Sequence, residues 1–138
     1  MSTLPESLGN LGNLQKLYLR DNHLKTLPLS IGELKTLRDL DVFNNQIDSL
    51  PESIGTLSTL RELSLNNNQL VSLPENIGNL QALRLLRLDN NQLTALPDSI
   101  TNLNNFQRLN IGKNKFGLLS PNIEKWINRL KSCGCEVR

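Results

Sequence analysis

LRELSLNNNQL, residues 60–70, contains the pattern that decides the fold. Leu63 and Leu65 alternate with polar residues, a period of two that is typical of a strand buried on one face. Asparagine then fills all three positions of residues 66–68. Composition cannot say whether these asparagines do the same job, so their roles depend on where they fall in a larger pattern.

That larger pattern is a repeat of 23 residues. Leu–Pro pairs begin at residues 4, 27, 50, 73 and 96. A motif L-x-x-L-x-L-x-x-N-x-L lies between them and is complete in LQKLYLRDNHL, LRDLDVFNNQI, LRELSLNNNQL and LRLLRLDNNQL. A fifth copy, FQRLNIGKNKF, keeps the spacing, with Phe106 and Phe116 in place of leucine. Five copies at constant spacing make the signal very specific.

These motifs resemble the leucine-rich repeat family, in its 23-residue form with the segment LPxSIGxL, present here as LPESIGTLSTL and LPENIGNLQAL. Bacterial leucine-rich repeat proteins, plant intracellular Ras-group-related repeat proteins and animal Ras-pathway scaffolds are similar. The resemblance implies a right-handed α/β solenoid, with short parallel strands on a concave face and 3₁₀ or short helical turns on a convex face. We expect one domain, 1–138, with five repeats in 4–118 and a C-terminal capping helix with a truncated sixth strand in 119–138.

The convex side of each repeat can be read from residues 51–60. Pro51 cannot donate to a strand ladder, so it begins the returning segment. Ile54, Leu57 and Leu60 then recur every three residues, as in a 3₁₀ turn. Glycine recurs at residues 9, 32, 55 and 78, which predicts a tight backbone bend, although Thr101 replaces it in the fifth repeat. One repeat buries too little apolar surface to offset its ordering entropy, so stability must come from stacking.

One asparagine of each repeat occupies the same position in the motif. These residues are Asn22, Asn45, Asn68, Asn91 and Asn114. We expect them to point inward, because the backbone turns there and an amide offers both a donor and an acceptor to unpaired backbone groups. The family resemblance implies the same structural role. Asn66, by contrast, falls at an outward strand position, and Asn67 is expected to be solvated.

The two ends depart from the repeat. Ile123, Trp126, Ile127 and Leu130 have helical spacing, after Ser120 as an N-cap, so a helix is expected to cover the last coil. Cys133 and Cys135 then fall in the register of buried strand leucines, which predicts two buried thiols, and they are too few for a zinc site.

The N-terminal end lacks such a helix. Its leucines are expected to face water, on the outward side of residues 8–19. This exposure is consistent with self-association, with a missing preceding domain or with a tolerated short edge.

The outward strand positions form the expected partner-binding surface. They are Lys16, Tyr18, Arg20, Asp39, Asp41, Phe43, Glu62, Ser64, Asn66, Leu85, Arg87, Asp89 and Arg108, followed by Asn110 and Gly112. Their charges are basic at the first strand, acidic at the second and third, mixed at the fourth and basic at the fifth, and such a mixed field favours a protein or peptide over a polyanion. Tyr18 and Phe43 are apolar side chains without a packing role there, and together they are expected to form one anchor near Arg20.

A column of arginines runs along the rim of this surface. Arg38, Arg61 and Arg84 stack at the 23-residue period. The expected explanation is a network of ion pairs with Asp39, Asp41 and Glu62; the alternative is a site for an anionic ligand.

Composition excludes several function classes. The net charge is only +2, with no basic stripe for nucleic acid, and no apolar run is long enough to span a membrane. His23 has no evident nucleophile partner and the glycines belong to the repeat, so no enzymatic activity, cofactor or metal is expected.

Three functions then remain. They are a cytoplasmic adaptor or scaffold, a bacterial effector secreted by a non-Sec route, and a recognition fragment of a larger protein. The scarcity of cysteine and the lack of a Sec-type signal favour the cytoplasm.

Overall fold

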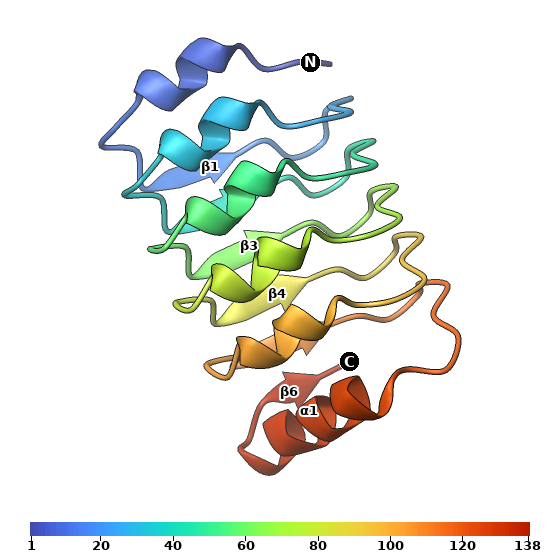
Figure 1. Cartoon of the computed structure of the whole chain (residues 1–138). Helices are drawn as coiled ribbons and strands as arrows, with labels where there is room; N and C mark the ends of the chain where they lie inside the picture. The colour runs from blue at the N-terminus through green and yellow to red at the C-terminus, as the bar shows by residue number, and fades with distance from the viewer.

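The protein is a stack of coils, described here by a computed structural model of residues 1–138 (Figure 1). Each coil passes from a short 3₁₀ helix on one side to a three-residue strand on the other. The 3₁₀ helices are η1 (Glu6–Asn10), η2 (Leu29–Glu33), η3 (Glu52–Thr56), η4 (Glu75–Asn79) and η5 (Asp98–Asn102). The strands are β1 (Lys16–Tyr18), β2 (Asp39–Asp41), β3 (Glu62–Ser64), β4 (Leu85–Arg87) and β5 (Arg108–Asn110). Helix α1 (Pro121–Ser132) and strand β6 (Glu136–Val137) complete the chain.

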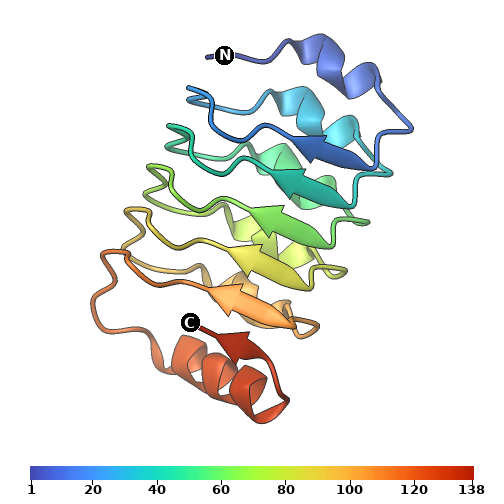
Figure 2. The same cartoon turned by 180° about the vertical axis from the view of Figure 1, so that it is seen from behind.

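The six strands form one open parallel sheet in chain order, β1 to β6 (Figure 2). The pairs among β1 to β5 are in register at the repeat period, so Leu63 lies beside Leu40 on one side and Leu86 on the other. These central leucines point inward, as the alternation predicted. The predicted leucine-rich repeat solenoid is therefore confirmed, with the 3₁₀ helices on the opposite side of the sheet.

A single apolar core runs the length of the stack. Its 33 buried residues come from every coil and from α1. Ile54, Leu57 and Leu60 of the third coil are fully buried between the strand layer and the 3₁₀ layer. Because most of this surface is buried against adjacent coils, each coil depends on its neighbours for stability.

Proline and glycine set the path of the 3₁₀ layer. Pro51 is extended (φ −67°, ψ 148°), and its carbonyl accepts the Ile54 N–H at 3.0 Å to open η3. Gly55 faces the next coil: a β-carbon there would lie 2.7 Å from the Asn76 carbonyl oxygen. Its φ is not positive. No left-handed conformation is therefore needed, as Thr101 in the same column indicates, and close approach between neighbouring 3₁₀ helices explains the glycine.

The turn after each strand uses a left-handed residue. Asn67 has φ 56°, and the same conformation recurs at Asp21, Asn44, Asn90 and Lys113. Asparagine and aspartate tolerate this region better than other non-glycine residues. The Asn90 side chain also donates to Asn67 Oδ1 at 2.7 Å. Backbone geometry therefore explains the middle asparagine, a role that the repeat pattern did not predict.

Helix α1 covers the last coil, as expected. Ser120 Oγ accepts the Ile123 N–H at 3.3 Å, which caps the helix. Trp126 is buried, donates from Nε1 to the Leu103 carbonyl at 2.9 Å, and meets Phe106 edge-on with ring centroids 5.9 Å apart. These contacts attach the helix to the fifth coil.

The predicted register of the sixth strand is wrong. Val137, not Cys133, lies beside Leu109. An α-helix advances about 1.5 Å per residue, compared with about 2 Å in a 3₁₀ helix, so crossing the coil consumes more residues. Cys133 consequently caps α1 and is exposed, whereas Cys135 is buried. The expectation of two buried thiols therefore fails for Cys133.

The N-terminal coil is only partly open. Leu11 is 51% exposed, but Leu14 and Leu17 are half-buried and Leu19 is buried. The expectation that this leucine face would be open to water is therefore wrong for Leu19. The first residues of the chain lie beside the first turn, where the Met1 carbonyl accepts the His23 N–H at 2.7 Å.

Candidate functional site

The candidate site is the outer surface of the sheet, called the strand face below. It carries the outward side chains of β1–β5 and of the residues that follow each strand. Exposed members are Lys16, Tyr18, Arg20, Glu62 and Arg108. Half-buried members are Asp39, Phe43, Asn66, Leu85, Arg87 and Asp89. Asp41 and Ser64 are buried at 5% exposure each, so the expectation that the outward positions are open to a partner is wrong for these two.

The asparagine ladder supports the strand face from inside. Asn68 accepts the Ile47 N–H of the preceding coil at 2.9 Å. Its Nδ2 donates to the Val42 carbonyl of that coil at 3.0 Å and to the Leu65 carbonyl of its own coil at 3.1 Å. Asn45, Asn91 and Asn114 repeat this pattern.

Asn22, at the end of the ladder, bonds only within its own coil, to the Leu19 and Arg20 carbonyls. No coil precedes it in this structure. The four inner members thus fix the spacing at which the strand-face side chains are presented.

An ion pair between Arg20 and Asp41 joins the first two strands close to Tyr18 and Phe43. Arg20 contacts the Asp41 carboxylate through Nε at 2.6 Å and through Nη2 at 2.5 Å. Asp41 also accepts the Phe43 N–H at 3.0 Å, which orients the carboxylate across the two strands. The hydrogen bond and the charge of Asp41 both raise the pKa of Arg20.

The rings of Tyr18 and Phe43 do not stack on each other, and their action as one anchor near Arg20 stays a prediction. Tyr18 lies opposite Asp41 in the strand register, and its ring is 60% exposed. Its hydroxyl donates to Asp39 at 3.5 Å. Phe43 follows the end of β2, and its carbonyl accepts the Asp21 N–H, so its backbone lies at the end of the strands next to the residues that follow β1. The surface offers two aromatic contacts on either side of an ion pair.

The centre of the strand face holds polar atoms without partners. Oδ1 of Asn66, of Asp89 and of Asn110 is buried and makes no hydrogen bond. Arg87, the last residue of β4, is half-buried and forms no ion pair. These three oxygens are covered by neighbouring atoms of the chain, so they are not offered to a partner as the structure stands.

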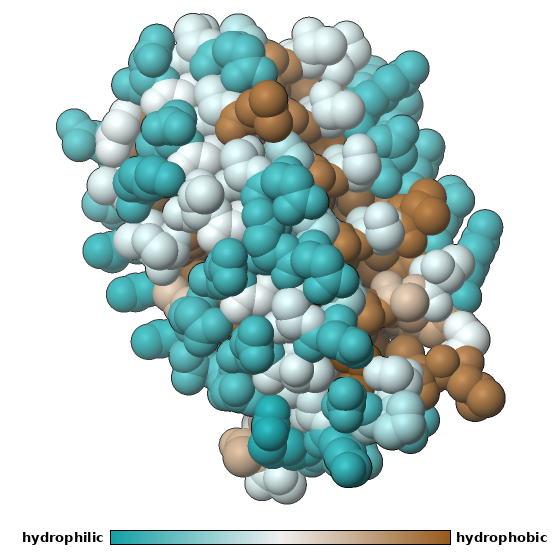
Figure 3. Space-filling view, viewed as in Figure 1, coloured by the Kyte–Doolittle hydropathy of each residue, from teal (hydrophilic) through white to brown (hydrophobic).

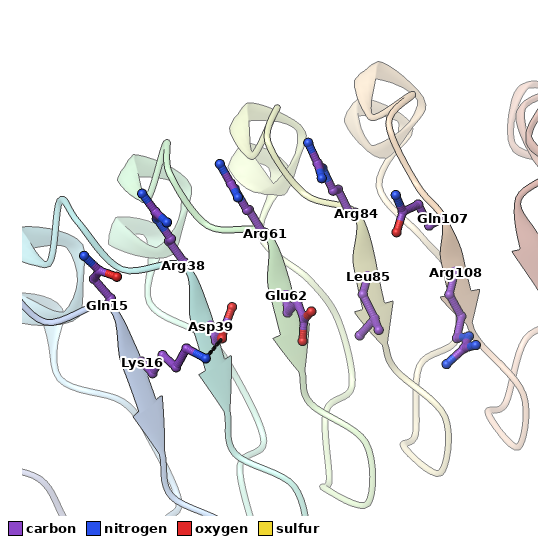
Figure 4. A pocket seen from close by; sticks show the side chains of 10 residues that line it. All are labelled: Gln15, Lys16, Arg38, Asp39, Arg61, Glu62, Arg84, Leu85, Gln107 and Arg108. Carbon is purple, nitrogen blue, oxygen red and sulfur yellow. Dashed lines mark ion pairs between the residues drawn. The ribbon is translucent and has the colours of Figure 1, made fainter.

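A shallow groove of about 460 Å³ crosses the strand face near the start of the strands (Figure 4). Two rows of side chains line it. The first outward row is Lys16, Asp39, Glu62, Leu85 and Arg108; the rim row is Gln15, Arg38, Arg61, Arg84 and Gln107. Figure 4 shows the three arginines extended side by side, with Asp39 and Glu62 directed away from them.

The predicted ion network of the rim arginines does not form. None of the four ion pairs includes Arg38, Arg61 or Arg84. Two of the carboxylates expected to neutralise them pair elsewhere. Asp39 meets Lys16 at 3.5 Å, and Asp41 meets Arg20.

The last strand adds residues that the sequence analysis did not assign. Arg108 donates from Nε to Glu136 of β6 at 2.7 Å, and Arg138 also pairs with Glu136. The Arg108 hydrogen bond, supported by the charges of both arginines, lowers the pKa of Glu136. The corrected register of β6 is what places Glu136 beside Arg108.

Comparison with known families identifies these repeats. A family model described as "Leucine-rich repeat region" matches residues 52–133, which is more than half of the chain. A second model, of paired leucine-rich repeats, matches residues 12–55. The chain belongs to the leucine-rich repeat family.

Solved structures agree on the fold. The chain is similar to a leucine-rich repeat protein of Leptospira interrogans, with a TM-score of 0.52 and 25% sequence identity. The match covers 99% of this chain and 52% of that protein, so this leucine-rich repeat chain spans about half of its length. No curated protein matches the chain significantly.

Leucine-rich repeat domains generally mediate protein–protein interactions and are typically non-catalytic. In this member, no group of three or more His, Cys, Asp or Glu side chains is placed to hold a metal ion. None of its helices is both long and apolar enough to cross a membrane.

The other side of this leucine-rich repeat protein is different in character. In Figure 3 the 3₁₀ side is covered mostly by hydrophilic and neutral residues, and hydrophobic residues reach the surface mainly along one edge. The groove and the unpaired arginines belong to the strand face.

Proposed function

We propose that the strand face binds a protein or peptide partner and that the protein acts as a non-catalytic adaptor or scaffold in the cytoplasm. The observation that carries the proposal is a groove along β1–β5 whose rim carries arginines that form no ion pair. Because no carboxylate of the chain pairs with these arginines, they stay available to a partner. Family membership supports the general class of function.

Energetically, Tyr18 is the strongest candidate contact. It is the one large apolar side chain of the strand face that is more than half exposed. Aromatic residues dominate many interfaces because they bury a large area at low entropy cost. Phe43, half-buried next to Arg20, offers a second contact whose backbone is already fixed.

Affinity capture followed by calorimetry with the purified partner tests this proposal. The Tyr18→Ala/Phe43→Ala double variant should weaken binding about tenfold or more, which corresponds to about 1.4 kcal/mol. Leu29→Ala/Val71→Ala is the matched control, because Leu29 and Val71 are exposed apolar residues (69% and 52%) outside the strand face. Unchanged affinity of the Tyr18/Phe43 variant, or an equal loss in the control, would contradict the proposal.

The cytoplasmic part of the proposal is supported by the cysteines. Both thiols are free, and Cys133 is exposed. An exposed free thiol suits a reducing compartment.

A further inference from the structure

We propose that Arg38, Arg61 and Arg84 form a docking strip for an acidic, extended segment of the protein partner. This inference rests on the proposed function and specifies the chemistry that the rim of the strand face recognises. It begins from an unusual feature: three cations of one row have no anion of their own chain within ion-pair distance.

The backbone fixes the spacing of the strip. The Arg61 N–H donates to the Arg38 carbonyl at 2.8 Å, and the Arg84 N–H donates to the Arg61 carbonyl at 2.8 Å. Adjacent strands lie about 4.8 Å apart, so the three α-carbons span roughly 10 Å. The backbone therefore fixes the α-carbons of the three arginines in one row, so their guanidinium groups start from neighbouring points on the rim. Figure 4 shows the three side chains side by side and extended in the same direction.

The strip is a region of unrelieved positive charge. Neighbouring guanidinium groups repel one another, and the chain's own carboxylates do not reach them, since Asp39 pairs with Lys16 and Glu62 points away. The repulsion is modest in water, but an anion that bridges two arginines would remove it and gain charge-assisted hydrogen bonds. Binding should consequently be favourable for carboxylates and sensitive to salt.

The shape of the surroundings selects the kind of anion. Gln15 and Gln107 end the row with neutral amides, so the strip has a short, defined length. Asp39 and Glu62 in the next row would repel a continuous polyanion such as nucleic acid. An extended polypeptide instead places alternate side chains on opposite sides, about 6.7 Å apart on each side. Its acidic residues can lie between successive arginines while neutral or basic residues face Glu62.

The test uses a short fluorescent peptide in which three glutamates alternate with serines, titrated into the full chain. A peptide with glutamine in place of glutamate is the ligand control. The protein variant is R38Q/R61Q/R84Q, because Gln15 and Gln107 show that the same position accepts glutamine. K25Q/K35Q/K125Q removes the same three charges from exposed positions outside the groove and serves as the matched control.

We expect the acidic peptide to bind, the glutamine peptide not to bind, and R38Q/R61Q/R84Q to weaken binding about tenfold or more while the lysine control changes it less than twofold. Thermal melts should show both variants folded. Absence of binding, or an equal loss in both variants, would overturn the inference. Tighter binding of an oligonucleotide or of free phosphate than of the acidic peptide would also overturn it.

The two proposals can fail separately. If R38Q/R61Q/R84Q keeps full affinity for the captured partner while the Tyr18/Phe43 variant loses it, the strip is wrong and the strand-face function stands. If neither variant affects the partner, the function itself is wrong.

Discussion

At the scale of single residues, the amide of Asn68 links two coils. Its oxygen accepts from Ile47 and its nitrogen donates to Val42 and Leu65. These backbone groups are buried, and the parallel ladder does not satisfy them at the point where the strand ends. Asn68 is itself only 8% exposed, so water has little access to replace it.

Replacing Asn68 by leucine should therefore lower the free energy of unfolding by about 1–3 kcal/mol, because an apolar side chain leaves the backbone groups unpaired. Urea denaturation followed by circular dichroism measures the change. Asn66→Ala, at an outward and only half-buried position, is the control and should change stability by less than about 0.5 kcal/mol. Equal losses in both variants would show that the ladder has no special role.

The residue scale also separates what could be predicted from what could not. The period of 23 residues distinguished the inward Asn68 from the outward Asn66. It did not reveal the left-handed conformation of Asn67, because alternation reports burial and not backbone dihedrals. A usable signal was nevertheless present, since four of the five left-handed positions are Asn or Asp.

At the scale of elements, neighbouring coils are in close backbone contact in the 3₁₀ layer. Gly55 and its equivalents let each 3₁₀ helix touch the backbone of the next one. Thr101 is found in the last 3₁₀ helix, where α1 replaces the next short helix. The exception in the glycine column thus marks the place where the stack changes its covering element.

Gly55→Ala should destabilise the protein by about 1–3 kcal/mol, because the new methyl group would overlap backbone atoms of Asn76. Gly112→Ala is the matched control. A β-carbon at Gly112 meets no atom within 4 Å, so that variant should be neutral or slightly stabilising. Thermal unfolding of the two variants measures the difference, and a harmless Gly55→Ala would disprove the packing explanation.

The C-terminal element yields a chemical prediction. Cys133 caps α1 and is exposed, whereas Cys135 is 8% exposed and its burial, aided by the nearby Glu136, raises the pKa of its thiol. A raised pKa means less reactive thiolate at neutral pH. Iodoacetamide should therefore label Cys133 first in the native protein, as followed by peptide mass spectrometry. In denaturant the two rates should converge; equal native rates would contradict the assigned register.

The register error has a simple origin. Counting repeats past Leu130 assumes that every covering segment advances like a 3₁₀ helix, and the sequence pattern contains no direct measure of rise per residue. The helix itself was predictable from Ile123, Trp126 and Ile127. The position of the strand after it was not, because it depends on how far the helix travels across the coil.

At the scale of the whole molecule, the sequence predicted which side chains reach the strand face but not how they pair. From the repeat period alone, Asp39 could pair with either Lys16 or Arg38. In the structure Asp39 turns to Lys16, Asp41 turns to Arg20, and the rim arginines remain unpaired. Pairing depends on side-chain direction, which the period does not specify.

The six strands form one open sheet, so the strand face is continuous. A partner meets the strand face as one rigid surface, because a single core and the inner members of the asparagine ladder hold all the coils in register. Binding should thus cost little ordering of this protein, and its specificity should come from the charges and aromatic side chains described above.

Amide hydrogen exchange of the complex with the captured partner tests this account most directly. We predict slower exchange at the amides of β2, β3 and β4 and of the turns that follow them, with η2, η3 and η4 unchanged. Protection that is confined to the 3₁₀ helices, with the strand face exchanging as in the free protein, would contradict the assignment of the strand face as the binding surface.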